Sequence, residues 1–356
     1  MSSICICGGG NLGHVIAGYL AAHGHEVHLL TRHPERFGGE LLIRMPEGEE
    51  PLRGRLRLVT GDAAAALDGA SMVLLCLPGF AIAPVLEQLA PQLRPEVTVG
   101  SVFCSSGFFP MAAKILPRGT RLFGFQRVPF IARTIRYGHE AFLMGYRDHI
   151  FLATENIPDG EAFVRGIGEL FGEKADRLDS YLEVTLTNSN PLLHPSRLYG
   201  MFGQQEEKDH HILFYEEWDE RSSEVLIRCD GEFQRLREAL GIPASAIPTL
   251  LEHYESHDAR SLTEKISHIP SLKGILAPML EVAPGRFVPD YSNRYFSEDI
   301  PYGMLMIKAY ALRKGIPTPM IDEILFWAQA KMGKEFLRKD GTLSGKDISA
   351  SAAPFI

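Results

Sequence analysis

The sequence lacks the features that mark a membrane-spanning, nucleic-acid-binding or disulfide-stabilised protein. No apolar run approaches the roughly 20 residues of a membrane span. Lysine and arginine form no cluster, and 36 basic against 44 acidic residues give a net charge of −8, which favours neither nucleic acid nor an anionic membrane as partner. The five cysteines, an odd number, form no CxxC pair. We therefore expect reduced, mostly buried thiols in a cytoplasmic protein.

Length and composition set the scale of the fold. With 356 residues, 45% of them hydrophobic, the chain can bury a large core and form two domains. No basic segment precedes an apolar one at the N-terminus, which predicts that the chain carries no signal peptide. A homodimer is among the assemblies that such a globular chain allows.

The most informative stretch is residues 4–36, which read ICICGGGNLGHVIAGYLAAHGHEVHLLTRHPER. An apolar run ends in glycines with the spacing Gly8, Gly10 and Gly13, and an Ala/Leu-rich segment then leads to a second apolar run. Strand, glycine turn, helix and strand are the context that the dinucleotide-binding fingerprint requires. Gly8 permits the tight turn, Gly10 the approach of a pyrophosphate and Gly13 close packing of helix on strand. Asn11 and Leu12 open the helix, whose N-terminus attracts phosphate.

The end of the second strand bears on the choice of dinucleotide. An NAD site usually places an acidic residue about 20 residues after the glycines to hold the ribose 2′-hydroxyl. Here the strand ends in Leu30, Thr31 and Arg32, without an acid. Arg32, helped by Thr31, suits a 2′-phosphate because a guanidinium offers paired donors. We expect NADPH, with NADH as the alternative if Arg32 is only a solvated loop cation.

Further strands are predicted in the first half of the chain. Residues 71–77 (SMVLLCL) form a buried strand that ends at Leu77 and Pro78, and a small-residue loop, 104–107 (CSSG), follows the next strand. Both lie at the carboxyl edge of a doubly wound sheet and are expected to line the nicotinamide half of the cofactor, although such turns are equally often structural. Residues 55–59 (RLRLV) predict another strand, and residues 141–154 a strand pair that extends the sheet.

The character of the sequence changes near residue 180, after which helical periodicity dominates. We predict an α/β Rossmann-like doubly wound domain over residues 1–178, followed by an all-helical substrate and catalytic domain over residues 179–356. The predicted helices include residues 181–193, 220–240, 303–314 and 320–337. Residues 339–356, rich in Ser, Gly, Ala and Asp, predict a loose tail.

A reductase also needs a proton donor, and His194 is the best candidate. It lies in TNSNPLLHPSR, residues 187–197, between Pro191 and Pro195, which predicts a break between two helices. A histidine there can give and take a proton during turnover. Asn190 could hydrogen-bond nicotinamide or substrate. Any one of the 13 histidines taken alone is more often structural, so spacing leaves both readings open.

A second candidate segment is YFSEDIPYG, residues 295–303. Asp299 precedes Pro301 at the start of a predicted helix, where a carboxylate is about as often a cap as a functional group. Arg294 could pair with a substrate carboxylate or be a surface cation. His253 and His257 have a spacing that can hold a metal, but no third ligand is suggested nearby, and we expect no metal site.

Four motifs together resemble one family, the octopine/nopaline dehydrogenases or opine dehydrogenases. GGGNLGH, NxNPLLHPS, RYFSEDIPYG and GIPTPMID occur in the order and approximate spacing of that family, over the chain up to about residue 337. The resemblance implies a dinucleotide-binding domain followed by a helical domain. It also implies a catalytic dyad of His194 and Asp299, with Arg294 as the arginine that binds substrate.

The chain departs from the family pattern at two places. It has CSSGFFP at residues 104–110 where many members have a glycine-rich loop, and QRVPFIAR at residues 126–133 where several have a threonine-leucine-proline motif. Arg127 then occupies a position expected to face substrate, which suggests an additional anionic group on the substrate.

The resemblance implies an NAD(P)H-dependent oxidoreductase. Its reaction joins an amino acid or other amine to an α-keto acid and reduces the imine to a secondary amine dicarboxylate. The alternatives are a keto-acid or polyol-phosphate reductase of the 6-phosphogluconate-dehydrogenase-like class, which needs no amine, and a non-catalytic protein that senses NADPH.

Overall fold

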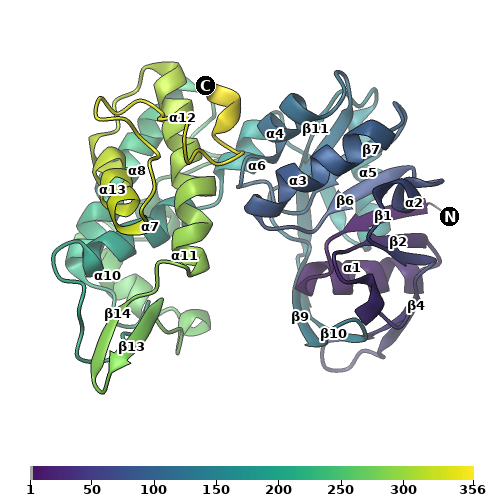
Figure 1. The fold of residues 1–356 in the computed structure, drawn as a ribbon, viewed down its shortest axis with the longest axis horizontal. Helices are drawn as coiled ribbons and strands as arrows, with labels where there is room; N and C mark the ends of the chain where they lie inside the picture. The colour runs from purple at the N-terminus through teal and green to yellow at the C-terminus, as the bar shows by residue number, and fades with distance from the viewer. Residues whose placement is uncertain (1–2) are drawn as a thin grey trace. The chain divides into compact units, whose positions relative to one another are not determined.

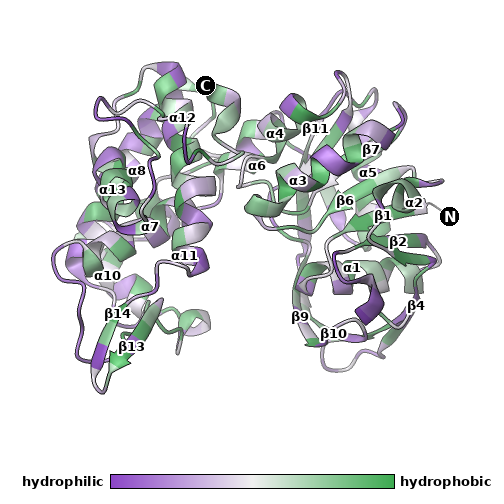
Figure 2. Cartoon of the chain, viewed as in Figure 1, coloured by the Kyte–Doolittle hydropathy of each residue, from purple (hydrophilic) through white to green (hydrophobic). Residues whose placement is uncertain are grey.

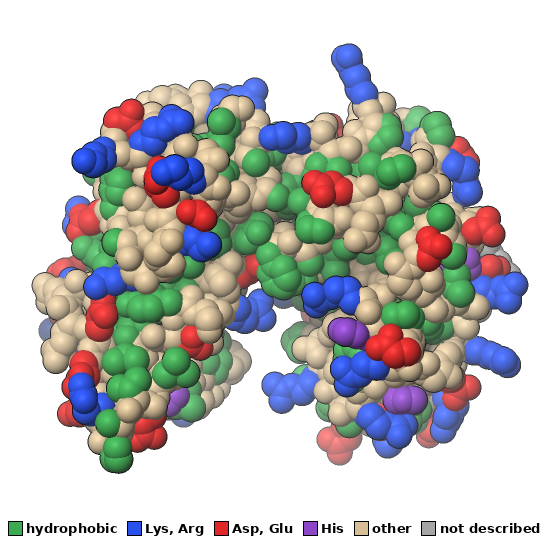
Figure 3. All heavy atoms as spheres, viewed as in Figure 1, with side chains coloured by type: hydrophobic (Ala, Val, Ile, Leu, Met, Phe, Trp, Pro, Cys, Tyr) green, Lys and Arg blue, Asp and Glu red, His purple; other side chains and the backbone are tan. Residues whose placement is uncertain are grey.

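The computed structural model describes residues 3–356, which form two compact units, the first ending at Thr185 and the second spanning Leu186–Ile356. Figure 1 shows strands flanked by helices in the first unit and mostly helices in the second. No helix within residues 3–356 is long and apolar enough to cross a membrane. On the face drawn in Figure 3, acidic and basic side chains are interspersed rather than gathered by sign.

The first unit is built on an eight-stranded sheet whose central strands are buried. Its strands, in spatial order, are β12 (Lys174–Arg177), β11 (His149–Glu155), β8 (Arg121–Phe125), β7 (Thr98–Ser101), β6 (Met72–Leu75), β1 (Ser3–Cys7), β2 (Glu26–Leu30) and β5 (Leu58–Thr60). Every neighbouring pair runs parallel except β8 and β11. Strands covered on both faces read as continuous apolar runs, and Figure 2 shows β1 and β6 accordingly as hydrophobic.

Helices and short helical turns connect these strands or follow the last of them. They are α1 (Asn11–Ala22), η1 (Pro34–Arg36), α2 (Ala63–Leu67), α3 (Gly79–Leu89), η2 (Ala90–Gln92), α4 (Phe108–Ile115), α5 (Gly160–Phe171) and α6 (Tyr181–Leu186). The strand order reverses beside β1, since β2 lies on one side of it and β6 on the other. In doubly wound sheets the crevice at such a switch point, at the carboxyl ends of the strands, is where ligands bind.

A second, four-stranded sheet packs against α1 in the same unit. Its order is β4 (Leu52–Arg55), β3 (Glu40–Arg44), β10 (Glu140–Tyr146) and β9 (Phe130–Arg136), and only β3 and β10 pair in parallel. Leu41, Ile43, Ala141 and Leu143 of this sheet join the core that α1 and the large sheet share.

Two strand predictions were wrong because of this second sheet. Residues 55–59 form no single strand: Arg55 ends β4 of the small sheet and Leu58 begins β5 of the large one. Residues 141–154 form no strand pair either, because β10 pairs with β3 and β9, whereas β11 pairs with β8 and β12. Alternation of side chains marks a strand but not the sheet that it joins, since pairing depends on distant segments.

The second unit is helical apart from one hairpin. Its helical elements are α7 (Asn190–Phe202), α8 (Glu220–Ala239), α9 (Leu250–His253), α10 (Ala259–Ser267), η3 (Pro270–Leu272), α11 (Arg294–Ser297), the π-helical turn η4 (Asp299–Met304), α12 (Leu305–Lys314), α13 (Pro319–Met332) and η5 (Ala353–Phe355). The hairpin consists of β13 (Met279–Ala283) and β14 (Arg286–Pro289). Helix α7 packs against both α8 and η4, which brings residues about 100 positions apart together.

The expected loose tail is instead packed down, so that prediction was wrong. Ser351 and Ala352 are fully buried, and the Ser351 hydroxyl donates to the backbone carbonyl of Tyr302. The ring of Phe355 contacts that of Tyr310 in α12 at a centroid distance of 4.5 Å. Small and polar residues therefore fill a tight contact here, where their composition alone predicts a solvated segment.

Candidate active site

The glycine turn between β1 and α1 has the geometry of a phosphate cradle. Gly8 has a φ of +113°, and a Cβ atom there would lie 2.6 Å from the Cys76 carbonyl oxygen. A Cβ atom on Gly13 would lie 1.7 Å from the Gly8 carbonyl oxygen, so helix and turn pack in contact. A Cβ atom on Gly10, by contrast, would meet no heavy atom of residues 3–356 within 4 Å. The internal packing requires Gly8 and Gly13, and Gly10 faces open space at the helix N-terminus.

The neighbours of this turn fix its position. The Asn11 side-chain oxygen accepts a hydrogen bond from the backbone amide of Thr134 in β9 at 2.9 Å, and Leu12 packs against the core. Leu77 and Pro78 follow β6 and lead into α3, with Pro78 as its N-cap. Asn11 and Leu12 thus begin α1, and Leu77 and Pro78 follow the neighbouring strand, so all four lie at the carboxyl ends of strands beside the switch point.

His14 holds the glycine turn, although the sequence did not single it out. It is fully buried in α1, its Nδ1 lies 2.9 Å from the Gly10 carbonyl oxygen, and its Nε2 lies 2.7 Å from the Gly138 amide nitrogen. Because Nε2 accepts from that amide, Nδ1 carries the proton and donates to Gly10. Burial lowers the pKa of His14, and the backbone hydrogen bond to Gly10 opposes the shift. A neutral imidazole therefore ties the glycine turn to the β9–β10 connection.

The segment after β2 presents a cation rather than an acid. Thr31 is buried and its amide donates to the Thr60 carbonyl oxygen, whereas Arg32 is exposed. Four residues further on, the guanidinium of Arg36 lies over the ring of Tyr137, 4.5 Å from its centroid. An exposed guanidinium at the end of the second strand can offer paired donors to a phosphate.

The second unit brings His194 and Asp299 together. His194 lies on α7 and Asp299 begins η4, and the His194 Nδ1 atom lies 2.8 Å from the Asp299 Oδ2 atom. The two side chains are 6% and 16% exposed, so water screens the pair poorly. The carboxylate accepts from Nδ1–H, which leaves Nε2 as the nitrogen that can exchange a proton.

The predicted helix break at His194 was wrong. His194 and Pro195 lie inside α7, which runs unbroken from Asn190 to Phe202. Pro195 removes one backbone hydrogen bond, to the carbonyl of Pro191, but α7 is almost wholly buried against its neighbours and continues past that loss. The one predicted helix over 181–193 is instead divided between α6 and α7.

Asp299 is also not a helix cap, which was the structural alternative. Glu298 is the residue that precedes η4, and the Asp299 carboxylate bonds His194 instead. The π-helical turn ends where α12 begins, so the segment Asp299–Met304 differs from the α-helix expected from residue 303. Single π-helical turns are often found at functional sites.

Three aromatic side chains surround the His194 imidazole. The Tyr215 hydroxyl oxygen lies 2.8 Å from Nε2. The Tyr295 ring lies against the imidazole with centroids 4.3 Å apart, and the Phe214 ring meets it edge-on at 5.7 Å. Sequence analysis missed Tyr215 because nothing local relates it to His194.

Arg197 holds the segment that carries Tyr215. Three residues after His194 on α7, it is 1% exposed and donates from Nε to the Phe214 carbonyl, from Nη1 to the Asp219 carboxylate and the Ser222 hydroxyl, and from Nη2 to the Glu217 carbonyl. Burial lowers the pKa of Arg197 while the nearby Asp219 raises it. A buried cation with this many acceptors fixes the loop rigidly to the helix. The sequence could have pointed to Arg197, because the motif HPSR places it three residues after His194, on the same face of a helix.

The remaining candidate residues are spread over both units. Arg294 is exposed at the start of α11, beside Tyr295. Asn190 begins α7, and its amide donates to the Asn188 side chain. Arg127 is half-buried just after β8 in the first unit.

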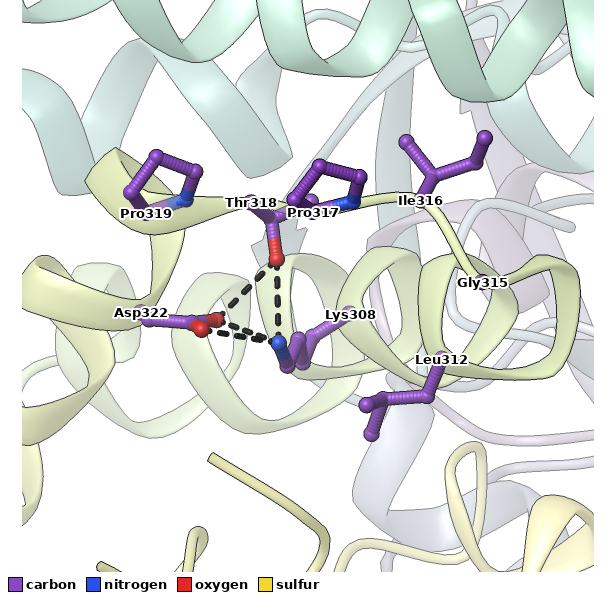
Figure 4. A pocket seen from close by; sticks show the side chains of 8 residues that line it. All are labelled: Lys308, Leu312, Gly315, Ile316, Pro317, Thr318, Pro319 and Asp322. Atoms are coloured by element: carbon purple, nitrogen blue, oxygen red, sulfur yellow. Dashed lines mark hydrogen bonds and ion pairs between the residues drawn. The ribbon is translucent and has the colours of Figure 1, made fainter. Parts of the chain in front are cut away.

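A surface pocket between α12 and α13 is lined by the GIPTP segment and Lys308 (Figure 4). Its Lys308 ammonium group bonds both Asp322 carboxylate oxygens, at 2.6 and 2.8 Å, and the Thr318 hydroxyl, at 3.0 Å. The polar groups of this pocket satisfy one another, which is the pattern of a structural cluster. No group of three or more His, Cys, Asp or Glu side chains within residues 3–356 could hold a metal ion.

Comparison with known proteins gives consistent matches along the chain. Residues 177–332 match the family model of the NAD/NADP octopine/nopaline dehydrogenase α-helical domain, and residues 4–107 match that of ketopantoate reductase PanE/ApbA. The chain is 30% identical to tauropine dehydrogenase of Arabella iricolor, covering 99% of this chain and 97% of that protein. It is 28% identical to octopine dehydrogenase of Pecten maximus, covering 99% and 95%. A solved structure of octopine dehydrogenase with NADH and L-arginine superposes with a TM-score of 0.88 at 27% identity, covering 99% of this chain and 95% of that one.

Proposed function

The chain belongs to the octopine/nopaline dehydrogenase family, the opine dehydrogenases, and from that premise we propose which of its residues carry out the family's reaction. The protein is an NAD(P)H-dependent oxidoreductase that condenses an amino acid with an α-keto acid and reduces the product to a secondary amine dicarboxylate. In the proposal, the first unit, which ends at Thr185 rather than at the expected residue 178, binds the cofactor, and the second unit carries the acid–base pair. The single observation that carries it is the 2.8 Å hydrogen bond between His194 and Asp299.

The glycine turn fits a dinucleotide. The open space at Gly10, the N-terminus of α1 and the positive φ of Gly8 together suit a pyrophosphate, with Asn11 and Leu12 at the helix start. Thr31 and Arg32 would hold the 2′-phosphate, and Leu77 and Pro78 would line the nicotinamide half. NADPH, when bound, supplies the hydride. This chain's own side chains carry out the other steps, which are substrate binding and proton transfer.

His194 acts as general acid and base in this proposal. Its Nε2 atom would give a proton to the carbonyl or imine and take it back in the reverse direction. Asp299, bonded to Nδ1, fixes the tautomer and stabilises the protonated imidazole, because a carboxylate 2.8 Å away in a poorly solvated site offsets much of the cost of the positive charge.

Arg294 would anchor a substrate carboxylate through paired hydrogen bonds, with Asn190 beside the dyad on α7. Changing Arg294 to Ala should raise KM for the keto acid or amino acid about 10-fold or more, since a hydrogen bond to a charged group is worth about 1.5–3 kcal/mol. Arg286, which is exposed and pairs with Glu207 at 2.6 Å, is the matched control. Equal KM values in the two variants would remove Arg294 from the proposal.

In the proposal, the Arg127 guanidinium would bind an additional anionic group on the substrate. An Arg127→Ala variant should then lose affinity for amino acids with an acidic side group and keep its affinity for neutral ones. Unchanged affinity for every substrate would contradict this part of the proposal.

The test of the function is NADPH oxidation against a matrix of amino acids and keto acids, with mass spectrometry of the products. We expect oxidation to require both partners and a secondary amine dicarboxylate to accumulate. The competing reductase function is favoured by one observation, the ketopantoate reductase match over residues 4–107. Steady oxidation with a keto acid alone, yielding a hydroxy acid, would favour that function instead.

The choice of NADPH over NADH rests on Arg32. We expect KM for NADPH to lie below KM for NADH, and an Arg32→Ala variant to bring the two together by weakening NADPH alone. A ratio of KM values that favours NADH tenfold or more would reject the assignment.

The five cysteines, all free and buried within residues 3–356, support a reducing compartment such as the cytoplasm.

A further inference from the structure

The proton-transfer nitrogen of His194 already has a partner in this structure. Its Nε2 atom lies 2.8 Å from the Tyr215 hydroxyl oxygen, and the two residues are 5% and 6% exposed. With Asp299 on Nδ1, both imidazole nitrogens are hydrogen-bonded to protein groups. A substrate atom that takes a proton from Nε2 must therefore displace the tyrosine hydroxyl.

Tyr215 can bond His194 in either charge state. A neutral imidazole protonated on Nδ1 accepts the phenol proton at Nε2, and a protonated imidazole donates Nε2–H to the phenol oxygen. Burial raises the pKa of Tyr215 far above its usual value, with a further increase from the nearby Tyr295. The hydroxyl thus keeps its proton across the working pH range.

The placement of Tyr215 is built into the fold. Its neighbour Phe214 accepts a hydrogen bond from the buried Arg197 through its backbone carbonyl. The Tyr215 ring is stacked nearly parallel to that of Trp218, at an interplanar angle of 8°, and the Trp218 indole donates to the Ser223 hydroxyl at 2.9 Å. Hydrogen bonds on both sides of Tyr215 hold this loop in place, so the 2.8 Å contact between the Tyr215 hydroxyl and Nε2 is a fixed feature of the site.

The hydroxyl of Tyr215 has a second partner within reach. Tyr295 lies over the imidazole face, and its hydroxyl interacts with that of Tyr215. Burial raises the pKa of Tyr295 as well, so both groups are neutral donors and acceptors. Tyr215 can therefore leave Nε2 without losing all of its hydrogen bonding.

We propose that Tyr215 is a positioning residue for His194, holding Nε2 while substrate is absent and yielding that nitrogen to the substrate. The proposal rests on the acid–base role of His194 described above. It concerns how this side chain is prepared for the reaction, and Tyr215 itself need not touch the substrate.

Removal of the hydroxyl has consequences that a purely structural role would not have. A hydrogen bond that a charged Nε2–H donates is stronger than one that a neutral Nε2 accepts, so a Tyr215→Phe change destabilises the protonated imidazole more. We expect the titration midpoint of the His194 imidazole to fall by about 0.5–1 pH unit. We also expect KM for the keto acid to fall about fivefold, because substrate no longer displaces a hydrogen bond of about 1 kcal/mol.

Other titratable groups near His194 stay in place in this variant. They are Asp299 on η4 and Arg294 and Tyr295 on α11, two elements that contact α7, and Tyr254, which interacts electrostatically with Tyr215. A change in midpoint can then be assigned to the missing hydroxyl.

The experiment is an NMR titration of the histidine Hε1 signals in the whole, ligand-free protein. The His194 signal is assigned by its loss in His194→Gln. Tyr199→Phe is the matched control, because Tyr199 lies on the same helix and its hydroxyl bonds Glu323 at 2.5 Å. A midpoint in Tyr215→Phe within 0.2 pH unit of the wild-type value and equal to that of the control would overturn the proposal. The threshold of about 0.2 pH unit corresponds to about 0.3 kcal/mol.

A measurement on the unaltered protein keeps the test independent of the variant's folding. In the ¹⁵N spectrum of the neutral form we expect His194 to carry its proton on Nδ1, and a proton on Nε2 would reject the arrangement. The titration needs no activity. An active wild-type enzyme with an unmoved midpoint rejects the role of Tyr215 alone, whereas absence of amine-dependent NADPH oxidation rejects the proposed function itself.

Discussion

The Nδ1 atom of His194 and the Oδ2 atom of Asp299 lie 2.8 Å apart, although 105 residues separate them in the chain. The π-helical turn at residues 299–304 brings the carboxylate to α7, and both side chains are shielded from water. This pair has the geometry of a base and the group that orients it.

An Asp299→Asn variant tests the pair. The amide preserves shape but removes the charge and can donate to Nδ1, which favours the wrong tautomer of His194. General acid–base catalysis contributes about 10²- to 10⁴-fold, and we expect kcat to fall within that range with KM changed less. Steady-state kinetics and thermal melting would be compared with wild type. Retention of more than a third of wild-type kcat would remove Asp299 from the mechanism.

The glycine turn predicts that substitutions at Gly13 and at Gly10 affect different properties, the stability of the fold and the binding of cofactor. A Gly13→Ala change places a Cβ atom 1.7 Å from a backbone oxygen and should destabilise the fold by about 3 kcal/mol or more. A Gly10→Ala change, at the N-cap of α1, should destabilise it by less than about 1 kcal/mol. It should nevertheless weaken NADPH binding about 10-fold or more, because the new methyl group occupies the space for the pyrophosphate. Urea unfolding and quenching of protein fluorescence by NADPH measure the two effects, and equal behaviour of the variants would contradict the assignment.

His14 predicts a loss of stability on the acid side. Burial lowers its pKa in the folded protein, so below about pH 6.5 the unfolded chain binds a proton that the folded chain does not. The contribution is complete above that pH and is lost progressively as pH falls through it. A His14→Gln variant, which can bond Gly10 and Gly138 without titrating, should lose less stability between pH 7 and pH 5 than wild type. The same change at exposed His257 serves as control, and parallel pH profiles for all three proteins would disprove the role of His14.

The Lys308–Asp322 pair predicts an asymmetry between its two partners (Figure 4). The Lys308 side chain is 5% exposed and that of Asp322 is 23% exposed. An Asp322→Ala change leaves a buried ammonium with only Thr318, and should cost about 3 kcal/mol or more. A Lys308→Met change leaves a carboxylate that water can reach and should cost less. Urea unfolding of both variants measures the difference, and a larger loss for Lys308→Met would contradict the structural reading.

Local chemistry explains what the sequence predicted well. The spacing of Gly8, Gly10 and Gly13 refers to one turn, in which Gly8 has a positive φ, Gly13 packs on the Gly8 carbonyl oxygen and Gly10 faces open space. The apolar runs of β1 and β6 likewise predicted buried strands, and both strands are buried.

What the sequence missed depends on contacts between distant segments. His14 was overlooked because its second partner is the amide of Gly138, and Tyr215 because its hydroxyl meets a helix 21 residues earlier. The pairing of His194 with Asp299 was predicted only through the family resemblance, since no periodicity links residues 105 positions apart. Pro191 and Pro195 predicted a helix break that the structure does not have, because the burial of α7 outweighed the local preference of prolines to end a helix.

The most direct measurement follows the label from deuterated NADPH into the product. Wild-type enzyme with deuteride-labelled cofactor, a keto acid and an amino acid should form a secondary amine dicarboxylate that carries one deuterium at the former keto carbon, and a His194→Ala variant should form almost none. Deuterium found instead in a 2-hydroxy acid, or undiminished labelling of the amine by the His194→Ala variant, would contradict the account.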